Sequence, residues 1–349
     1  MAAGLFVHGS LWLPPKLLFV AVGDASQAFR MGAFYAISGL LSALALERRD
    51  PTLWLRNRLF QLGIPAFCAL VVFSPLIWYT VAHSRAAAFG WPLLPFEWHH
   101  LWFLFGLMLY SVFAVLLHRA DSRFGLISRL DGVAEEGSGR VAILAVAALS
   151  ACSLSVTGPL TLAILPRGYS QAFGNVQLIS GYLPLFLLGF IIARANRLFD
   201  MVIAERRFCA LLCAIVTAAY FATHFINSLV PLASHVRFIA ATLCPPAAFA
   251  IILGSAISIR RVPAFLRHLS DASYTIYILH YPISVFINAR LAVHVEANAA
   301  YVLSVIASGS MSFAFHVIVV QRSSVMRLLI NGKAAPSIGV EHRNRACKT

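Results

Sequence analysis

The amino-acid sequence predicts an all-α polytopic membrane protein with ten transmembrane helices, and three observations carry that prediction. Of the 349 residues, 60% are hydrophobic and only 11% are charged, and the mean hydropathy is +0.81. This balance excludes a water-soluble domain. Apolar runs of about 20 residues, the length that crosses roughly 30 Å of hydrocarbon, follow one another along the chain. Arginines gather in every second gap between these runs, as expected of cytoplasmic loops.

The elements follow in order from the apolar runs. The first run, 2–13, is too short for a full span, so we expect the first helix to be truncated at Met1. The polar residues after Asn331 predict a disordered cytoplasmic tail, 331–349, behind a single transmembrane domain, 1–330. Nine full spans are predicted between them, at 26–46, 59–81, 99–117, 141–164, 178–193, 208–230, 236–259, 270–289 and 299–320.

The distribution of basic residues predicts the orientation. Of the 27 Lys and Arg, 21 fall on one predicted side of the membrane and six on the other. Because cytoplasmic loops carry the excess, both termini are expected in the cytoplasm. The net charge of +14 then reflects topology, so we expect the lipid bilayer as a partner and no nucleic acid.

Ionisable side chains inside the spans are the first functional candidates, because burying them in lipid is costly. No Asp or Glu falls in the middle of a span, so buried base chemistry must come from histidine. His8 lies near the outer interface of the first span. His280 lies near mid-membrane, on one helical stripe with Ser273 and Tyr277. For a single histidine, a hydrogen bond to a neighbouring helix is the simpler explanation.

Arginines and histidines at the ends of two spans are further candidates. Arg56 and Arg58 stand at the mouth of the third span, where guanidinium groups suit bidentate phosphate contacts. Anchoring of a cytoplasmic loop explains them equally well. His99 and His100 open the fourth span beside Trp102, and adjacent histidines are unusual in the aromatic belts found there.

The second span opens on Arg30, which we count at the outer end of that span. Small residues follow at spacings that place them near one helix face, and such residues let two membrane helices approach closely. They are Gly32, Ala36 and Gly39.

Six segments carry recognisable motifs, in order along nearly the whole chain. They are His8, Phe29–Met31 with Phe34–Gly39, Arg58–Pro65, His100–Leu104, Gly181–Phe186, and Ser273 to Pro282. Together with a ten-span topology they resemble the acyltransferase 3 family of membrane proteins. The resemblance is strongest to its glucan biosynthesis protein C branch, which succinylates periplasmic glucans.

The resemblance implies a multi-pass O-acyltransferase in the bacterial cytoplasmic (inner) membrane. It implies that a succinyl or acetyl group passes from a cytoplasmic acyl-CoA-type donor to a hydroxyl of a periplasmic glycan. His8 is then the expected catalytic residue, as general base or transient acyl carrier. The side chains expected to bind the donor are Arg56, Arg58, Tyr277 and His280. Those expected to bind the acceptor are Arg30, His99, His100 and Trp102.

The six cysteines show no zinc or redox spacing, so we expect no metal and no permanently bound cofactor. The alternative interpretation is a transporter or flippase of a polar or lipid-linked solute. Inverted repeats and paired broken helices would favour it, and the sequence shows neither. A structural scaffold leaves the histidines and the polar stripe of His280 unexplained. No motif encodes the acyl group, the acceptor or the oligomeric state.

Overall fold

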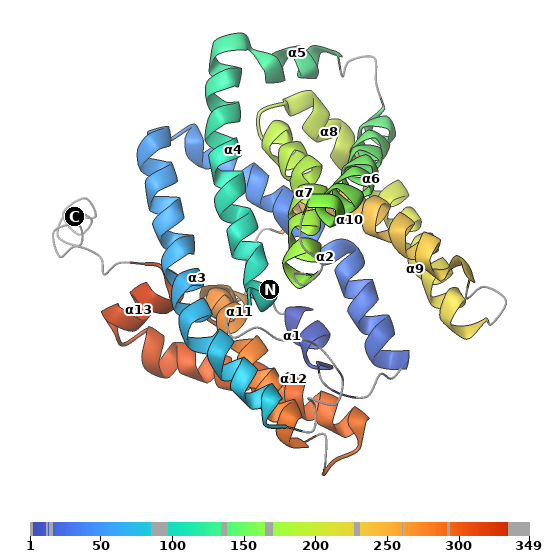
Figure 1. The fold of residues 1–349 in the computed structure, drawn as a ribbon. Coiled ribbons are helices and arrows are strands. Elements are labelled where there is room, and N and C mark those ends of the chain that lie inside the picture. Colours follow the sequence, from blue (N-terminus) through green and yellow to red (C-terminus); the bar gives the residue numbers. More distant parts are fainter. Residues whose placement is uncertain are drawn as a thin grey trace.

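The computed structural model describes residues 3–11, 13, 17–84, 97–133, 138–164, 170–226, 231–259, 261–291 and 294–333. Within these ranges all regular structure is helical and no strand occurs (Figure 1). The α-helices are α1 (Ala3–His8), α2 (Leu17–Leu46), α3 (Pro51–Ala82), α4 (Trp102–Phe124), α5 (Leu126–Val133), α6 (Gly139–Ile164), α7 (Ser170–Ile192), α8 (Asn196–Ala204), α9 (Arg206–Phe225), α10 (Ala233–Ser258), α11 (Ala264–Leu291), α12 (Ala297–Phe315) and α13 (Ser324–Asn331). A 3₁₀ turn, His99–Leu101, precedes α4, and a π-helical turn, His316–Val320, continues α12.

Long helices coincide with the nine predicted full spans, which confirms the all-α class. In the described part of the chain, eight helices are long and apolar enough to cross a membrane, namely α2, α3, α4, α6, α7, α9, α10 and α12. The 28-residue α11 is not among the eight, because its polar side chains lower its hydropathy. The count of ten spans and the orientation stay predictions, and so does the disordered tail, since 334–349 lie outside the described residues.

The second span differs most from its predicted limits. The prediction begins it at residue 26, whereas α2 begins at Leu17 and runs unbroken for 30 residues. Asp24, Ser26 and Gln27 interrupt the apolar run without ending the helix, because backbone hydrogen bonds and not hydropathy define it. Arg30 therefore lies in the middle of α2 and not at its outer end.

Ion pairs connect several helix ends on one side of the bundle. Arg194, just after α7, lies with Nη1 2.8 Å from a carboxylate oxygen of Asp121 in α4. Its Nε lies 3.4 Å from a carboxylate oxygen of Glu47, just after α2. Arg140 of α6 similarly pairs at 2.9 Å with Glu205, which joins α8 to α9. These ion pairs join helix ends that the distribution of arginines predicts on one side of the membrane.

Three short helices were not predicted from the sequence. The helices α5, α8 and α13 have eight, nine and eight residues, and their apolar residues occupy one face only. Figure 1 shows α5 and α8 at the same end of the bundle. A segment that is apolar on one face produces no continuous apolar run, so a search for membrane spans overlooks it.

The small residues of α2 provide close helix contacts, as predicted. A methyl group on Gly39 would overlap the backbone of Phe186 in α7, and one on Gly32 would overlap Pro245 in α10. The carbonyl of Ala36 lies directly against Gly189 of α7. Close approach of backbones is how membrane helices pack without a hydrophobic driving force. It fixes α2, which carries Arg30, against α7 and α10.

Candidate functional site

The short helix α1 is held by hydrogen bonds from α11. The side-chain nitrogen of Asn288, which is fully buried, donates to the carbonyl oxygens of Gly9 at 2.9 Å and Leu11 at 2.7 Å. Both carbonyls lie within three residues of the end of α1, beyond its intrahelical hydrogen bonds. These bonds fix His8, the last residue of α1, beside α11. Figure 1 shows α1 enclosed by α2, α11 and α12.

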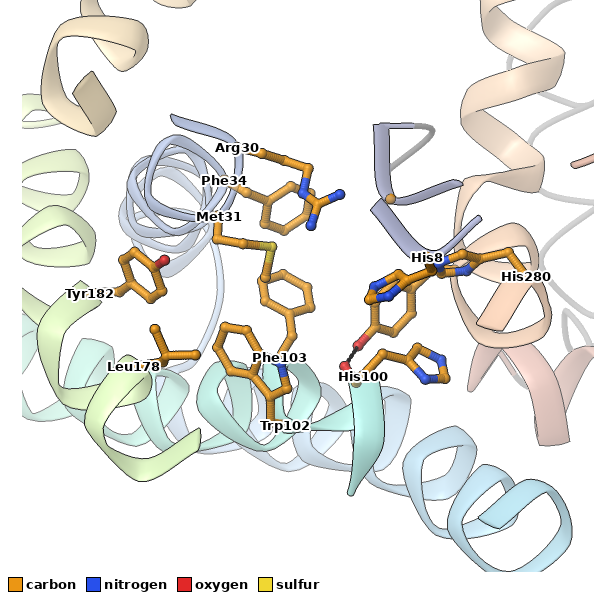
Figure 2. A pocket seen from close by; sticks show the side chains of 12 residues that line it. His8, Arg30, Met31, Phe34, His100, Trp102, Phe103, Leu178, Tyr182 and His280 are labelled. Atoms are coloured by element: carbon orange, nitrogen blue, oxygen red, sulfur yellow. Dashed lines mark hydrogen bonds between the residues drawn. The ribbon is translucent and has the colours of Figure 1, made fainter. Parts of the chain in front are cut away.

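Three histidines from different helices meet beside α1. The ring centroids of His8 and His280 lie 5.2 Å apart, and those of His100 and His280 lie 5.5 Å apart. His8 and His100 are separated by 6.3 Å. Tyr281 stacks on His100 at 4.7 Å, and the hydroxyl of Tyr277 donates a hydrogen bond to the carbonyl of His100. The structure thus brings together three histidines that lie far apart in the sequence (Figure 2).

The hydrogen bonds of His280 define its tautomer. Its Nδ1 lies 2.8 Å from the carbonyl oxygen of Ile276, which can only accept a hydrogen bond. Nδ1 therefore carries the proton of the neutral ring, and Nε2 is left as an acceptor. Nε2 is buried and has no hydrogen-bond partner among the described residues. Nδ1 of His8 is also buried and unpartnered there, so no comparable bond orients the His8 ring.

A cavity of about 140 Å³ lies between these histidines and α2. Figure 2 shows the side chain of Arg30 extending from α2 toward it. Nε and Nη1 of Arg30 are buried and have no hydrogen-bond partner in the described part of the chain. A buried guanidinium without a partner is costly, so this cavity favours a polar or anionic ligand. Its lining comprises Gly4, His8, Arg30, Met31, Phe34, His100, Trp102, Phe103, Leu178, Tyr182, Tyr277 and His280.

A second cavity, of about 490 Å³, adjoins the first and extends toward the turn between α2 and α3. Arg49, Asn57 and Arg58 line it, and Nε of Arg58 is buried without a partner among the described residues. Phe34 and Phe103 line both cavities, with ring centroids 4.8 Å apart in an edge-to-face arrangement. This aromatic pair separates the two cavities.

Most of the predicted site residues line one of the two cavities. Arg58 lines the second cavity, and neither lining includes Arg56 or His99. Arg56 is exposed, and the His99 ring lies 3.8 Å from the carboxylate of Glu97. Six predicted residues line the first cavity: His8, Arg30, His100, Trp102, Tyr277 and His280. The expected donor and acceptor residues therefore largely share one cavity.

Several residues that line the first cavity were not predicted to have a role. Gly4 lies four residues before His8, and Phe34 lies four residues after Arg30, so each shares a helix face with a predicted site residue. That spacing was the signal that could have found them. Tyr182, which stacks on Trp102 at a centroid distance of 6.3 Å, belongs to a segment that carried the resemblance without a role.

Within the described ranges, no group of three or more His, Cys, Asp or Glu side chains has the geometry to hold a metal ion. This holds also for the three histidines of the first cavity. The polar groups that line the cavity are imidazole, phenol and guanidinium side chains.

Comparisons with known proteins cover almost the whole chain. A family described as an acyltransferase domain matches residues 2–320. The glucans biosynthesis protein C of Escherichia coli O6:K15:H31 (strain 536 / UPEC) is 22% identical over 306 residues, which cover 81% of this chain and 76% of that protein. The protein of the same name from Escherichia coli O9:H4 (strain HS) matches to the same extent. No solved structure matches the chain.

Proposed function

Because this chain belongs to the acyltransferase 3 family and is a membrane acyltransferase, we propose that it moves a succinyl or acetyl group from a cytoplasmic acyl-CoA-type donor to a hydroxyl of a periplasmic glycan. The observation that supports this proposal is the pair of adjoining cavities, one lined by Arg49 and Arg58 and the other by three histidines together with Arg30. The glucans biosynthesis proteins similar to this chain support a glycan as acceptor. The membrane in question is the bacterial cytoplasmic membrane.

The second cavity fits the donor. Its lining follows α2 from Phe34 to Ala45, eleven residues or roughly 17 Å at 1.5 Å per residue. Arg49 and Arg58 supply guanidinium groups for the phosphates of a nucleotide carrier, while the long arm of the carrier follows the cavity. The thioester then reaches the aromatic pair of Phe34 and Phe103, which must move apart to admit it.

The first cavity fits the reacting groups. A neutral imidazole takes a proton near pH 7 and is also a nucleophile, so His8 serves either as general base or as transient acyl carrier. The acceptor hydroxyl enters on the side of Trp102 and Tyr182, whose stacked rings suit the apolar face of a sugar.

Mass spectrometry of glycans tests the proposed function. Cells lacking this protein are compared with the same cells complemented by the wild-type chain, and the masses of periplasmic and envelope glycans are measured. We expect an acyl mass increment only in the complemented cells, and the size of the increment identifies the acyl group. If no glycan changes mass, acyl transfer to glycans is excluded, and lipid substrates or solute transport become the better explanations.

Removing the buried guanidinium of the second cavity is expected to weaken donor binding. In Arg58→Gln, the KM for the acyl-CoA donor should rise roughly tenfold to a hundredfold, because a hydrogen bond to a charged group contributes about 1.5–3 kcal/mol. The kcat should change little. Steady-state kinetics of the purified protein in liposomes measure both.

The matched control is Arg123→Gln, which removes the same charge from the exposed end of α4 without touching either cavity. If both variants raise the KM equally, Arg58 acts through general electrostatics and does not contact the donor.

A further inference from the structure

Gly4 lies close to two polar groups of the first cavity. A Cβ atom placed on Gly4 would lie 3.3 Å from Nε2 of His280 and 3.5 Å from Nη1 of Arg30. Both nitrogens are buried and lack partners among the described residues. Because Gly4 has no side chain, a substrate atom can approach its Cα on the side that faces both nitrogens.

The two nitrogens have opposite hydrogen-bonding roles. Nε2 of His280 accepts, because Nδ1 holds the ring proton against the carbonyl of Ile276. Nη1 of Arg30 donates only. Acyl transfer requires one group that takes a proton from the attacking hydroxyl and another that donates to the developing oxyanion. A point within reach of both is where a reacting carbonyl can sit.

His8 is placed to deliver an acyl group to this point. His8 and Gly4 are four residues apart in α1 and lie on one helix face. Side chains in a helix lean toward the N-terminus, so the ring of His8 covers the turn that contains Gly4. Its ring centroid lies 5.2 Å from that of His280.

We propose that His280 is the general base of the transfer and that Arg30 binds the oxyanion, with the reacting carbonyl over Gly4. This inference rests on the proposed function and assigns to His8 the second of its two roles, acyl carrier. The hydrogen bond from Nδ1 of His280 to the carbonyl of Ile276 supports this assignment of the base role to His280, because a catalytic base is oriented by a third group.

The reaction then has two balanced halves. The unprotonated ring nitrogen of His8 attacks the thioester carbonyl carbon, a C–N bond forms, the C–S bond breaks and the thiolate leaves. The acceptor hydroxyl next attacks the same carbon and gives its proton to Nε2 of His280. A C–O bond forms, the C–N bond breaks, and neutral His8 is restored. His280 finally passes its proton to the thiolate, and in both halves Nη1 of Arg30 donates to the carbonyl oxygen.

His280→Asn separates the two halves. The asparagine amide can keep the hydrogen bond to the Ile276 carbonyl while the base nitrogen is lost. Exchange of isotopically labelled CoA with succinyl-CoA or acetyl-CoA, without acceptor, reports the first half. We expect exchange to persist, while transfer to a linear glucose oligomer falls 10²- to 10⁴-fold in kcat with the donor KM unchanged. An increase in donor KM with kcat unchanged would instead make His280 a donor-binding residue and overturn the inference.

Gly4→Ala tests the shared point itself. The new methyl group would occupy the space between Nε2 of His280 and Nη1 of Arg30, so exchange and transfer should both fall at least tenfold. Alanine favours the helix more than glycine does, so α1 should be retained and the melting temperature preserved. The control is Gly23→Ala in α2, where the added carbon has no neighbour within 4 Å among the described side chains and the backbone of other helices.

The outcomes separate this inference from the proposed function. A wild-type protein that transfers no acyl group to any glycan contradicts the proposed function. A wild-type protein that transfers acyl groups but shows no exchange, or that keeps full activity in Gly4→Ala or His280→Asn, contradicts only the inference drawn from Gly4.

Discussion

Replacing His8 with alanine is expected to abolish acyl transfer, by roughly a thousandfold or more, while the protein stays folded in the membrane. In the proposed mechanism His8 carries the acyl group, so its removal should stop the exchange half-reaction as well as transfer. Its Nδ1 has no hydrogen-bond partner among the described residues, so alanine leaves no group there newly unpaired. Mass spectrometry of glycans and labelled-CoA exchange measure the two activities.

A control variant distinguishes loss of the cavity histidine from loss of any histidine. His83→Ala removes an exposed histidine that follows α3 and lines neither cavity, and it should retain both activities. Gel filtration in detergent checks that His8→Ala is folded. Adding free imidazole should restore part of the exchange, because the substitution leaves room for it. Transfer at the wild-type rate in His8→Ala would remove His8 from the mechanism.

The long helices were predictable because each is one continuous apolar run, which needs no knowledge of its neighbours. Their ends were less predictable. Local polar residues moved the expected start of α2 to residue 26, and this displaced Arg30 from mid-helix to a span end. The short helices α5, α8 and α13 depend on one apolar face each and were overlooked.

The direction in which the side chains of the candidate site point was less predictable than the helices. A sequence cannot tell which of two neighbouring residues turns toward a cavity. His100 lines the first cavity and His99 does not. His99 has a positive φ of 41°, which departs from ordinary 3₁₀ geometry, so its side chain leaves the backbone in a different direction from that of His100. In the same way, Arg58 faces the second cavity while Arg56 on the same helix is exposed.

The meeting of the three histidines could not be predicted either. It depends on tertiary contacts between α1, the turn before α4, and α11. The sequence does contain the periodic part of the site, because Gly4 precedes His8 by four residues and Phe34 follows Arg30 by four. Periodicity places residues on a common face, and only packing places one face against another.

Among the described glycines, Gly189 at the crossing of α2 and α7 is expected to tolerate an added methyl group least. In Gly189→Ala the added methyl group would occupy the position of the Ala36 carbonyl, and backbone cannot move aside as a side chain can. The two helices must separate, which we expect to destabilise the fold by about 3 kcal/mol or more. The higher helix propensity of alanine, about 1 kcal/mol, does not offset this cost.

Thermal unfolding of the purified variant, followed by tryptophan fluorescence, should show a melting temperature lower by about 5 °C or more. Gly63→Ala is the matched control, because the nearest atom that its methyl group meets among the described residues of other helices is the flexible end of Met108, at 3.4 Å. Separation of α2 from α7 also moves Arg30 away from Tyr182, so any folded Gly189→Ala protein should lose transfer. A variant with the wild-type melting temperature and activity would show that α2 and α7 do not cross at Gly189.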